Sequence, residues 1–169
     1  MSENGKQYKC FIFDKDGTLC RSKSGKDTIN SPEDQELIPG VEQALSILRD
    51  AYPNSPFLIA SNQGGVAFGT LTYTQANDCV NAAIRAIGGS LAVFCPEHPQ
   101  GIVPPYVVDS EYRKPKPGMI NFLLGELGIA PSDALMVGDR PEDQEAAEAA
   151  GVDFEWADKF FDRDPFNGG

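Results

Sequence analysis

Residues 11–19 read Phe-Ile-Phe-Asp-Lys-Asp-Gly-Thr-Leu, and this stretch decides the expected fold. Its apolar, β-prone residues predict a buried strand that ends at Phe13, and the carboxylates of Asp14 and Asp16 follow two residues apart. In open parallel α/β sheets, ligands bind in a crevice outside the carboxyl ends of the strands. Two carboxylates at such a strand end can hold a hard cation and can attack or protonate a phosphate ester. The stretch therefore predicts phosphoryl chemistry at the end of the first strand.

The composition predicts a globular chain with one domain over residues 1–169. Of its residues, 41% are apolar and 23% are charged, and no apolar run is long enough to cross a membrane. The polar N-terminus does not resemble a secretory signal, and the four cysteines include no CxxC pair, so we expect reduced thiols and a cytoplasmic location. The net charge of −11 argues against non-specific binding to nucleic acids or membranes. We expect a monomer or a weak dimer.

Apolar strands and helices alternate along the chain. The predicted strands are Tyr8–Phe13, Phe57–Ala60, Leu91–Cys95, Ala134–Val137 and, at the edge, Val152–Trp156. The predicted helices are Pro39–Ala51 with Pro39 in its first turn, Thr74–Ile87 with Thr74 as its N-cap, Gly118–Leu127 and Pro141–Ala150. Continuous apolar strands separated by helices predict a three-layer α/β fold with a mainly parallel sheet. The long segments Arg21–Pro39 and Glu97–Lys116 are predicted surface loops.

Polar residues gather where these strands end, and the carboxyl ends of parallel strands share one edge of the sheet. Besides Asp14 and Asp16, three groups follow the strand ends: Ser61-Asn62-Gln63, Arg113-Lys114, and Asp139 with Asp143. This edge would collect a nucleophile and an acid, a hydroxyl and an amide, a fixed cation and further carboxylates. These groups are what phosphoryl transfer through an aspartyl-phosphate requires.

The four segments, in this order and at these strand ends, resemble the four motifs of the haloacid dehalogenase (HAD) superfamily of phosphohydrolases. The resemblance covers residues 11–143, and four motifs in order are far more specific than the first motif alone. Residues 61–65 (SNQGG) and 113–119 (RKPKPGM) are similar to one branch of the superfamily. That branch contains histidinol-phosphate phosphatase, heptose bisphosphate phosphatase and the polynucleotide 3′-phosphatases. The resemblance implies a Rossmann-like HAD core and a phosphatase that uses Mg²⁺.

The resemblance implies the roles of the catalytic residues. Asp14 would be the nucleophile, with its other carboxylate oxygen on Mg²⁺. Asp16 would be the general acid for the leaving alcohol and then the general base for the hydrolytic water, and its backbone carbonyl would also bind the metal. Lys114 would supply the charge that lets Asp14, Asp139 and a phosphate dianion lie close together.

By the same resemblance, the remaining motif residues would bind the substrate and complete the metal site. Ser61 would donate its hydroxyl to the phosphoryl group, Asn62 would place the leaving group, and Arg113 would reach the substrate. Asp139 would complete the Mg²⁺ coordination, and Asp143 would act through water or by orienting a ligand. Asp143 also has a simpler interpretation, because an acidic residue in the first turn of a helix favours the helix dipole.

Two lysines beside the motifs are not assigned to the site. Alternation along an extended segment predicts that Lys15 points away from Asp14 and Asp16. Lys116 is predicted to be a solvated loop residue.

Residues 95–99 (CPEHP) are similar to the zinc loop of the heptose bisphosphate phosphatases, but most of its ligands are missing. In that family a Cys-x-His pair is completed by a Cys-x-Cys just before the Arg-Lys-Pro motif. Here Glu97 stands at the histidine position, and Ser110 and Tyr112 stand at the cysteine positions. A structural zinc site needs four ligands, so with only Cys95 and His98 present we expect a loop without metal.

The spacing between the motifs leaves no room for a full cap domain. Core elements use much of the chain between Asp16 and Ser61 and between Gln63 and Lys114. We therefore expect an open site, shaped by the loops over residues 20–39 and 97–113.

The resemblance leaves two substrate classes open. Residues 61–69 and 95–99 favour a small phosphorylated metabolite, such as a sugar phosphate or histidinol phosphate, and we favour this class. Residues 112–115 and 156–161 are more similar to the polynucleotide 3′-phosphatases, which makes a 3′-phosphorylated nucleic-acid end the alternative substrate. Such an end would meet a basic rim made of Arg21, Lys23, Lys26, Arg113 and Lys116. An alternative of another class is a non-catalytic protein that binds phosphorylated ligands.

Overall fold

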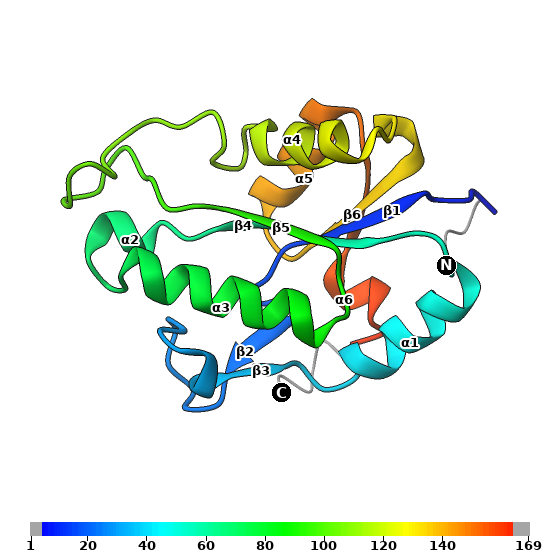
Figure 1. The fold of residues 1–169 in the computed structure, drawn as a ribbon, viewed down its shortest axis with the longest axis horizontal. Helices are drawn as coiled ribbons and strands as arrows, with labels where there is room; N and C mark the ends of the chain where they lie inside the picture. Colours follow the sequence, from blue (N-terminus) through cyan, green and yellow to red (C-terminus); the bar gives the residue numbers. More distant parts are fainter. Residues whose placement is uncertain (1–4, 164–169) are drawn as a thin grey trace.

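The computed structural model describes residues 5–163, and a five-stranded parallel sheet forms its centre (Figure 1). The strands are β1 (Cys10–Phe13), β4 (Phe57–Asn62), β5 (Leu91–Cys95), β6 (Ala134–Gly138) and β7 (Asp153–Trp156). Their order across the sheet is β5-β4-β1-β6-β7, and every neighbouring pair is parallel. The chain first adds strands on one side of β1 and then on the other. The carboxyl end of β1 therefore lies where the strand order reverses, which is the usual ligand site of α/β sheets.

Helices cover both faces of the sheet. α4 (Gly118–Leu127) and α5 (Pro141–Ala150) lie on one face, and α1 (Val41–Ala51), α3 (Tyr73–Ala86) and α6 (Ala157–Phe160) lie on the other (Figure 1). The predicted three-layer α/β fold with a mainly parallel sheet is confirmed. The prediction of one domain over residues 1–169 includes residues 1–4 and 164–169, which lie outside the described part of the chain.

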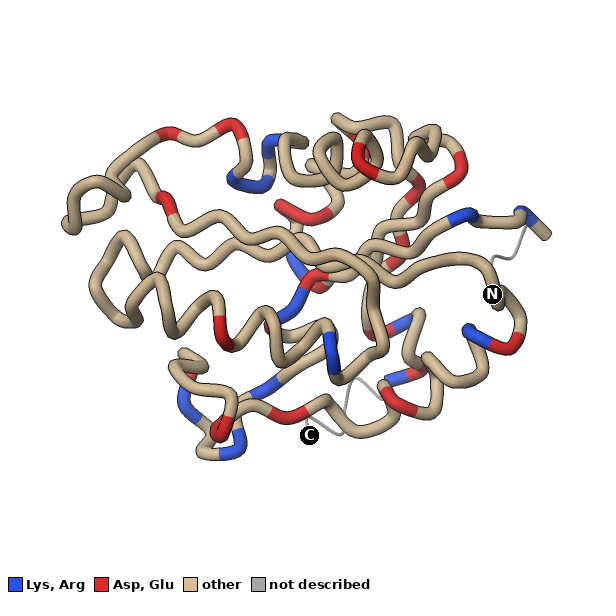
Figure 2. The backbone as a smooth tube through the Cα atoms, viewed as in Figure 1, with Lys and Arg blue, Asp and Glu red and all other residues tan. Residues whose placement is uncertain are grey.

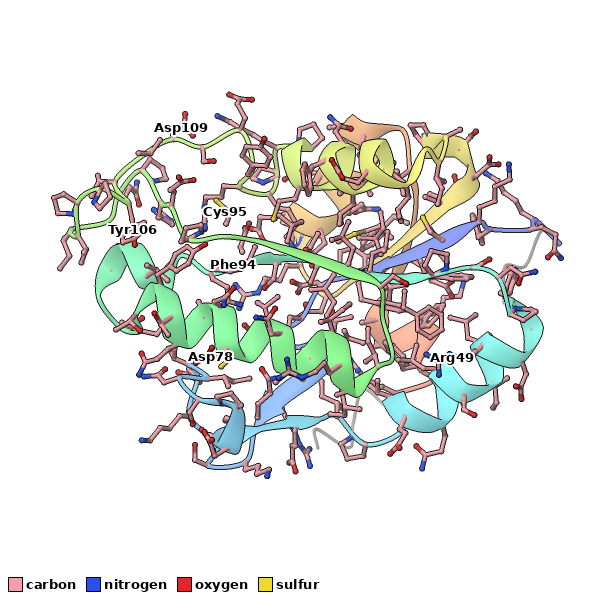
Figure 3. The ribbon with its side chains drawn as sticks, in the orientation of Figure 1. Arg49, Asp78, Phe94, Cys95, Tyr106 and Asp109 are labelled. Carbon is pink, nitrogen blue, oxygen red and sulfur yellow. The ribbon has the colours of Figure 1, made fainter. Side chains whose placement is uncertain are left out.

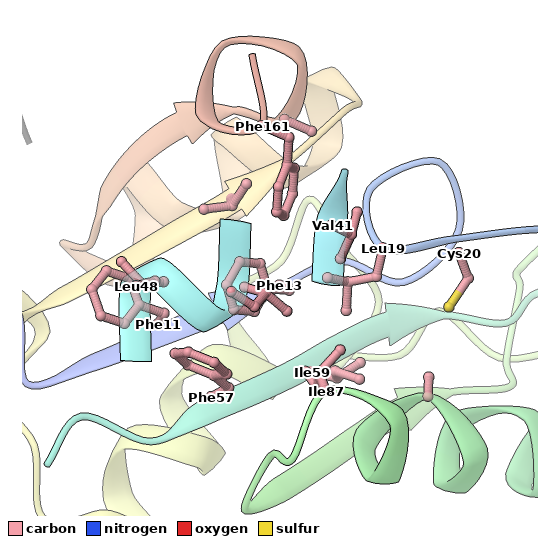
Figure 4. Close-up of a cluster of buried hydrophobic side chains, with 14 of the residues drawn as sticks. Phe11, Phe13, Leu19, Cys20, Val41, Leu48, Phe57, Ile59, Ile87 and Phe161 are labelled. Atoms are coloured by element: carbon pink, nitrogen blue, oxygen red, sulfur yellow. The ribbon is translucent and has the colours of Figure 1, made fainter. Parts of the chain in front are cut away.

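Alternating strand side chains fill two separate hydrophobic cores. On the face covered by α1, α3 and α6, the Phe57 ring packs edge to face against Phe13 and Phe11, with centroids 5.8 and 6.1 Å apart (Figure 4). On the opposite face, Cys10 and Ile12 belong to the core that includes residues of α4 and α5. Because both faces of β1 are buried, its register in the sheet is fixed, and so is the position of the residue that follows it.

The predicted elements are present, with small shifts at their ends. The strand Leu91–Cys95 and the helices Gly118–Leu127 and Pro141–Ala150 have the predicted bounds. The helix predicted to start at Pro39 instead starts at Val41, because the glycine before Val41 has a left-handed φ of 93°. Short helices that the sequence did not predict are α2 (Gly65–Phe68), α6 and two 3₁₀ turns, Pro32–Asp34 and Pro131–Asp133.

The predicted N-cap of α3 is wrong by two residues. Thr72, rather than Thr74, caps the helix: its hydroxyl accepts a hydrogen bond from the Gln75 backbone N–H at 3.1 Å. The Gln75 side chain in turn accepts from the Thr72 N–H at 2.8 Å. This capping box needs Gln or Glu three residues after the cap, and Gln75 has that spacing from Thr72 only.

The predicted surface loop over residues 21–39 contains a small antiparallel ribbon. β2 (Cys20–Ser22) pairs with β3 (Gln35–Leu37), and this β2–β3 ribbon lies on the α3 side of the sheet (Figure 1). Strands of three residues are too short to show alternation, so no sequence pattern predicts them. Among residues 5–163 no insertion forms a separate cap domain, as the motif spacing predicts.

Acidic residues outnumber basic ones along the chain, 25 to 14. Figure 2 shows Lys and Arg scattered singly or in short runs among the acidic residues. No helix within residues 5–163 combines the length and the apolar character that a membrane span requires.

Candidate active site

Asp14 follows β1 directly and continues the sheet, because its N–H donates to the Val137 carbonyl of β6 at 3.0 Å. Its side chain is buried, and Oδ1 accepts a hydrogen bond from the Nζ of Lys114 at 2.9 Å. Lys114 Nζ also donates to Asp143 Oδ1 and to the Ala60 carbonyl, both at 2.7 Å. A single buried ammonium with three acceptors thus joins the ends of β1 and β4 to α5.

Asp14, Asp139 and Asp143 form an acidic cluster in which one oxygen of each lies within 4.8 Å of the others. Asp14 and Asp143 are buried, whereas Asp139 is exposed. Carboxylate oxygens are the ligands that Mg²⁺ prefers. These three carboxylates, two of which contact the one ammonium of Lys114, carry excess negative charge, which a divalent cation would neutralise. The chemistry of this donor set therefore fits Mg²⁺.

The electrostatics of the cluster oppose a fully ionised state without a cation. Burial raises the pKa of Asp14 well above its ordinary value; the charge of Lys114 opposes this shift, and Asp143 and Asp139 reinforce it. Burial alone would lower the pKa of Lys114, but Asp14 and Asp143 outweigh burial and raise it. In the absence of metal, burial therefore favours protonation of Asp14, whereas Asp14 and Asp143 favour the charged form of Lys114.

Thr18 and Gly17 shape the position of Asp139. The buried hydroxyl of Thr18 donates to Asp139 Oδ1 at 3.0 Å. Gly17 has a φ of 83°, which favours glycine, and a Cβ at this residue would displace the Asp139 carboxylate. No role for Thr18 was predicted, although its place directly after Asp16-Gly17 was the available signal.

Asp16 is turned differently from Asp14 and lies outside the acidic cluster. Its Oδ1 accepts from Lys15 Nζ at 2.6 Å, and its Oδ2 accepts from Gln63 Nε2 at 3.0 Å. The prediction that Lys15 points away from both acids is therefore wrong for Asp16. The chain turns after Asp14, with the Leu19 N–H donating to the Lys15 carbonyl at 2.9 Å, and alternation holds only for extended segments.

Ser61 and Asn62 lie at the end of β4, where the sequence places them. Ser61 is buried, and its Oγ accepts from Gln63 Nε2 at 2.8 Å. Asn62 makes two hydrogen bonds to the backbone of Lys114, donating to its carbonyl and accepting from its N–H, both at 3.0 Å. These contacts hold the Lys114 loop against β4. The role of Asn62 in placing a leaving group stays a prediction.

The side chain of Asp143 is buried and makes more hydrogen bonds than a role in favouring the helix dipole would require. It is 2% exposed, and its Oδ2 accepts from the N–H groups of Asp139 and Arg140 at 3.1 Å each, while Oδ1 accepts from Lys114. Both oxygens are thus already engaged. This geometry favours a water-mediated or orienting role toward a metal over direct coordination.

A cleft of about 370 Å³ opens beside these groups. Its lining includes Asp14, Asp16, Asn62, Arg113, Lys114, Arg140 and Asp143. The Arg113 guanidinium is partly buried, which lowers its pKa, and its Nη1 is buried without a hydrogen-bond partner against Gly64. An unsatisfied buried N–H is costly, so Arg113 is short of an acceptor that an anionic ligand would supply.

The predicted basic rim is divided between two places. Arg21, Lys23 and Lys26 line a second hollow of about 530 Å³, which adjoins the first cleft across Asp16 and Arg140. Lys116 lines neither hollow; it is partly exposed and pairs with two acidic residues of the same loop, Asp109 and Glu111.

Cys95 ends β5, where the loop toward α4 begins (Figure 3). Its thiol lies 3.5 Å from Glu97 Oε2, and burial raises the pKa of the thiol. His98 Nδ1 accepts from the Gln100 N–H at 3.0 Å. Ser110 is buried in the same loop. The interpretation of this loop as metal-free stays a prediction.

Arg163, for which no role was predicted, contacts the backbone of the turn after β1. Its guanidinium donates to the carbonyls of Gly17, at 3.0 Å, and Thr18, and it lies over the Phe161 ring. The segment after α6 thereby holds the turn that carries Asp16. No local pattern indicates this contact, because the partners are about as far apart as the described chain allows.

The sequence resembles known phosphatases along most of its length. A family model described as polynucleotide kinase 3 phosphatase matches residues 9–164. The chain is 31% identical to the D-glycero-beta-D-manno-heptose-1,7-bisphosphate 7-phosphatase of Haemophilus ducreyi, over 85% of this chain and 79% of that protein. It is 30% identical to the protein of the same name from Escherichia coli K12, over 87% and 77%.

Solved structures show the same architecture. The D,D-heptose 1,7-bisphosphate phosphatase of B. bronchiseptica, complexed with magnesium and phosphate, has a TM-score of 0.71 and 28% identity, covering 86% of this chain and 78% of that one. A HAD-like phosphatase from Mesorhizobium loti has a TM-score of 0.74 over 87% of this chain and 70% of that one. Its identity of 24% supports the shared fold alone.

Proposed function

Because this chain belongs to the polynucleotide kinase 3 phosphatase family and is a phosphatase of the HAD superfamily, we propose that its substrate is a small phosphorylated metabolite. We propose that hydrolysis proceeds through an aspartyl-phosphate and uses Mg²⁺. The observation that carries the proposal is the 2.9 Å contact between Asp14 and Lys114 within the acidic cluster, at the cleft. A carboxylate fixed beside a cation and a metal site can approach a phosphate dianion that it would otherwise repel.

In the first half-reaction, a carboxylate oxygen of Asp14 attacks phosphorus, and the bond from phosphorus to the leaving oxygen breaks. Asp16 gives its proton to that oxygen, so the alcohol leaves neutral and Asp14 carries the phosphoryl group. In the second half-reaction, water attacks the phosphorus of the aspartyl-phosphate, and Asp16 takes up a proton from that water. Inorganic phosphate leaves, and the Asp14 carboxylate is restored. Asp16 suits both steps because it lines the cleft with its side chain 43% exposed.

Asp14, Asp139 and the backbone carbonyl of Asp16 would hold Mg²⁺, with Asp143 acting through water or by orienting its neighbours. Bound Mg²⁺ would supply charge that offsets the repulsion between the carboxylates and the phosphate dianion. Lys114 supplies the same kind of charge from the protein side. Ser61 would donate its hydroxyl to the phosphoryl group, and Arg113 would reach the substrate.

Removing divalent cations with a chelator is expected to silence phosphate release, and adding Mg²⁺ alone is expected to restore it. Zinc should not be needed, because the loop that resembles the zinc loop of the heptose bisphosphate phosphatases has Glu97, Ser110 and Tyr112 at three of the four ligand positions. Phosphate release is measured before chelation, after it and after Mg²⁺ is returned, with metal content determined in parallel. Full activity in protein shown to be free of divalent cations would contradict the metal assignment.

The stability of the metal-free protein is expected to fall as the pH rises, and Mg²⁺ is expected to oppose that fall. The folded state raises the pKa of Asp14, so folding favours its protonated form; stability therefore declines from the unfolded value of about 4 upward through the folded value. Mg²⁺ must displace this proton, so its apparent affinity should increase with pH.

Thermal unfolding with and without Mg²⁺, from about pH 5 to pH 8, measures both effects. Each kcal/mol corresponds to a shift of about 2–4 °C in Tm for a chain of this size. The Asp14→Asn variant lacks the titrating group and serves as the control. Identical pH dependence in wild type and variant would contradict the assignment to Asp14.

The small-metabolite class is supported by the relatives, which are named as phosphatases of a sugar bisphosphate, and by the net charge of −11. The second candidate is a polynucleotide 3′-phosphatase. It is favoured by the family model that matches residues 9–164 and by Arg21, Lys23 and Lys26, which line the hollow next to Asp16.

A substrate panel tests the proposed function and separates the two candidates. Phosphate release is measured with Mg²⁺ from sugar phosphates, sugar bisphosphates, histidinol phosphate, nucleotides and a 3′-phosphorylated oligonucleotide, against the Asp14→Asn variant. We expect turnover concentrated in the sugar phosphates and bisphosphates. Turnover of the oligonucleotide alone would favour the second candidate, and release from no member of the panel would overturn both.

A further inference from the structure

Lys15 is a buried charge to which the proposed chemistry gives no role. Its side chain is fully buried, and Nζ donates to Asp16 Oδ1 at 2.6 Å and to Gln35 Oε1 at 2.8 Å. An ammonium is rarely buried unless it is paired, because removing it from water is costly. Asp16 is the one carboxylate that it contacts in these hydrogen bonds, so the pair is a fixed feature of the fold rather than a surface ion pair.

Asp16 is held from a second side as well. Its Oδ2 accepts from Gln63 Nε2 at 3.0 Å, and the same nitrogen donates to Ser61 Oγ at 2.8 Å. Gln63 is buried, so this contact is protected from competing water. Both carboxylate oxygens are thus bound to buried donors, while the side chain of Asp16 still reaches the cleft.

The side chain of Lys15 is also held by residues outside the turn that follows β1. Gln35, which binds Lys15, is the first residue of β3 in the β2–β3 ribbon. Its Nε2 donates to the Cys79 carbonyl of α3 at 2.9 Å. A chain of three side-chain contacts therefore runs from α3 through the ribbon to the Asp16 carboxylate.

We propose that Lys15 is a positioning residue that, together with Gln63, holds Asp16 in the orientation from which it exchanges a proton with the leaving oxygen. This inference rests on the proposed role of Asp16 as general acid. The transfer needs the two oxygens within about 2.6–3.2 Å of each other, and a carboxyl group that rotated freely would spend little time there. Lys15 itself gives and takes no proton in the reaction.

The leaving group distinguishes a positioning role from a general structural one. An alkyl phosphate needs a proton on its departing oxygen, whereas p-nitrophenyl phosphate releases a stable anion without one. The value of kcat/KM covers binding and the steps up to departure of the leaving group, so it includes the acid role of Asp16 but not its later base role. With Lys15→Met, which keeps the length of the side chain, we expect kcat/KM to fall about 10–100-fold for the alkyl phosphate and less than about threefold for p-nitrophenyl phosphate.

Asp16→Asn should show the same selectivity with a larger fall in kcat/KM. For the alkyl phosphate, the double variant Lys15→Met/Asp16→Asn should have the same kcat/KM as Asp16→Asn alone. Circular dichroism, Tm and Mg²⁺ binding by calorimetry report the fold and the metal site of each variant. If Lys15→Met does not fold, Gln63→Leu tests the second contact and is expected to show the same selectivity.

The outcomes separate this inference from the proposed function. Suppose that Asp16→Asn lowers kcat/KM mainly for the alkyl phosphate, but that folded Lys15→Met and Gln63→Leu lower kcat/KM equally for both substrates, or for neither. The positioning role is then overturned and the acid role stands. If Asp16→Asn itself shows no selectivity, the acid role fails, and the positioning role fails with it.

Discussion

Asp14→Asn is expected to abolish phosphate release while leaving the fold intact. A carboxamide is a far weaker nucleophile than a carboxylate and cannot form the aspartyl-phosphate, so the loss in kcat should be on the order of 10⁴-fold or more. Asn keeps the shape of the side chain and an oxygen that can accept from Lys114 at the position now 2.9 Å from its Nζ. Because burial raises the pKa of Asp14, removing this carboxylate should also stabilise the metal-free protein.

Two measurements test Asp14 separately from the rest of the site. Phosphate release compares the variant with Asp27→Asn, which alters an exposed carboxylate in the lining of the same cleft and should remain active. Rapid acid quenching followed by mass spectrometry looks for phosphate on the peptide that contains Asp14. Near-normal turnover by Asp14→Asn, or phosphate trapped on a different residue, would remove Asp14 as the nucleophile.

Lys114→Met is expected to cause the largest combined loss of activity and stability. Lys114 is 2% exposed, and its ammonium binds Asp14, Asp143 and the Ala60 carbonyl. Its removal leaves two buried carboxylates without their cation, a change that typically costs about 3–5 kcal/mol near neutral pH. At mildly acidic pH the loss should be smaller, because burial raises the pKa of Asp14 and this carboxyl group then takes up a proton.

Chemical denaturation with and without Mg²⁺ measures this loss, and phosphate release measures the effect on catalysis. Mg²⁺ should recover part of the stability, because it brings positive charge to Asp14 and Asp139. The matched control is Lys116→Met, two residues away, where the lysine is partly exposed and pairs with Asp109 and Glu111. Equal losses in the two variants would argue against a special role for the buried ammonium of Lys114.

Much of the fold could be read from local sequence patterns. The strand Leu91–Cys95 is a short apolar run, and the helix Pro141–Ala150 has proline at its first position and a glycine directly after it; both elements have the predicted bounds. The N-cap of α3 is equally local, but Thr72 and Thr74 compete for it. The glutamine three residues after Thr72 decides between them.

Other features could not be read in this way because no local pattern encodes them. The β2–β3 ribbon consists of three-residue strands, which are too short to show alternation. Lys15 was predicted to point away from Asp16 on the assumption of an extended backbone, whereas the chain turns there, with a φ of 83° at Gly17. The side chain then folds back onto its neighbour.

The sequence by itself determined the identity and order of the four motifs, three of them directly after strands and the Arg113-Lys114 motif in the loop before α4. Those properties depend on hydrophobic periodicity and on the rule that parallel strands end at one edge, both of which are visible in a single chain. Only the tertiary structure decided which partner each polar group has. Asn62 binds the backbone of Lys114, whose ammonium lies between Asp14 and Asp143. Such partners depend on how β1, β4 and α5 pack, and a buried polar group takes whatever donor or acceptor that packing brings within reach.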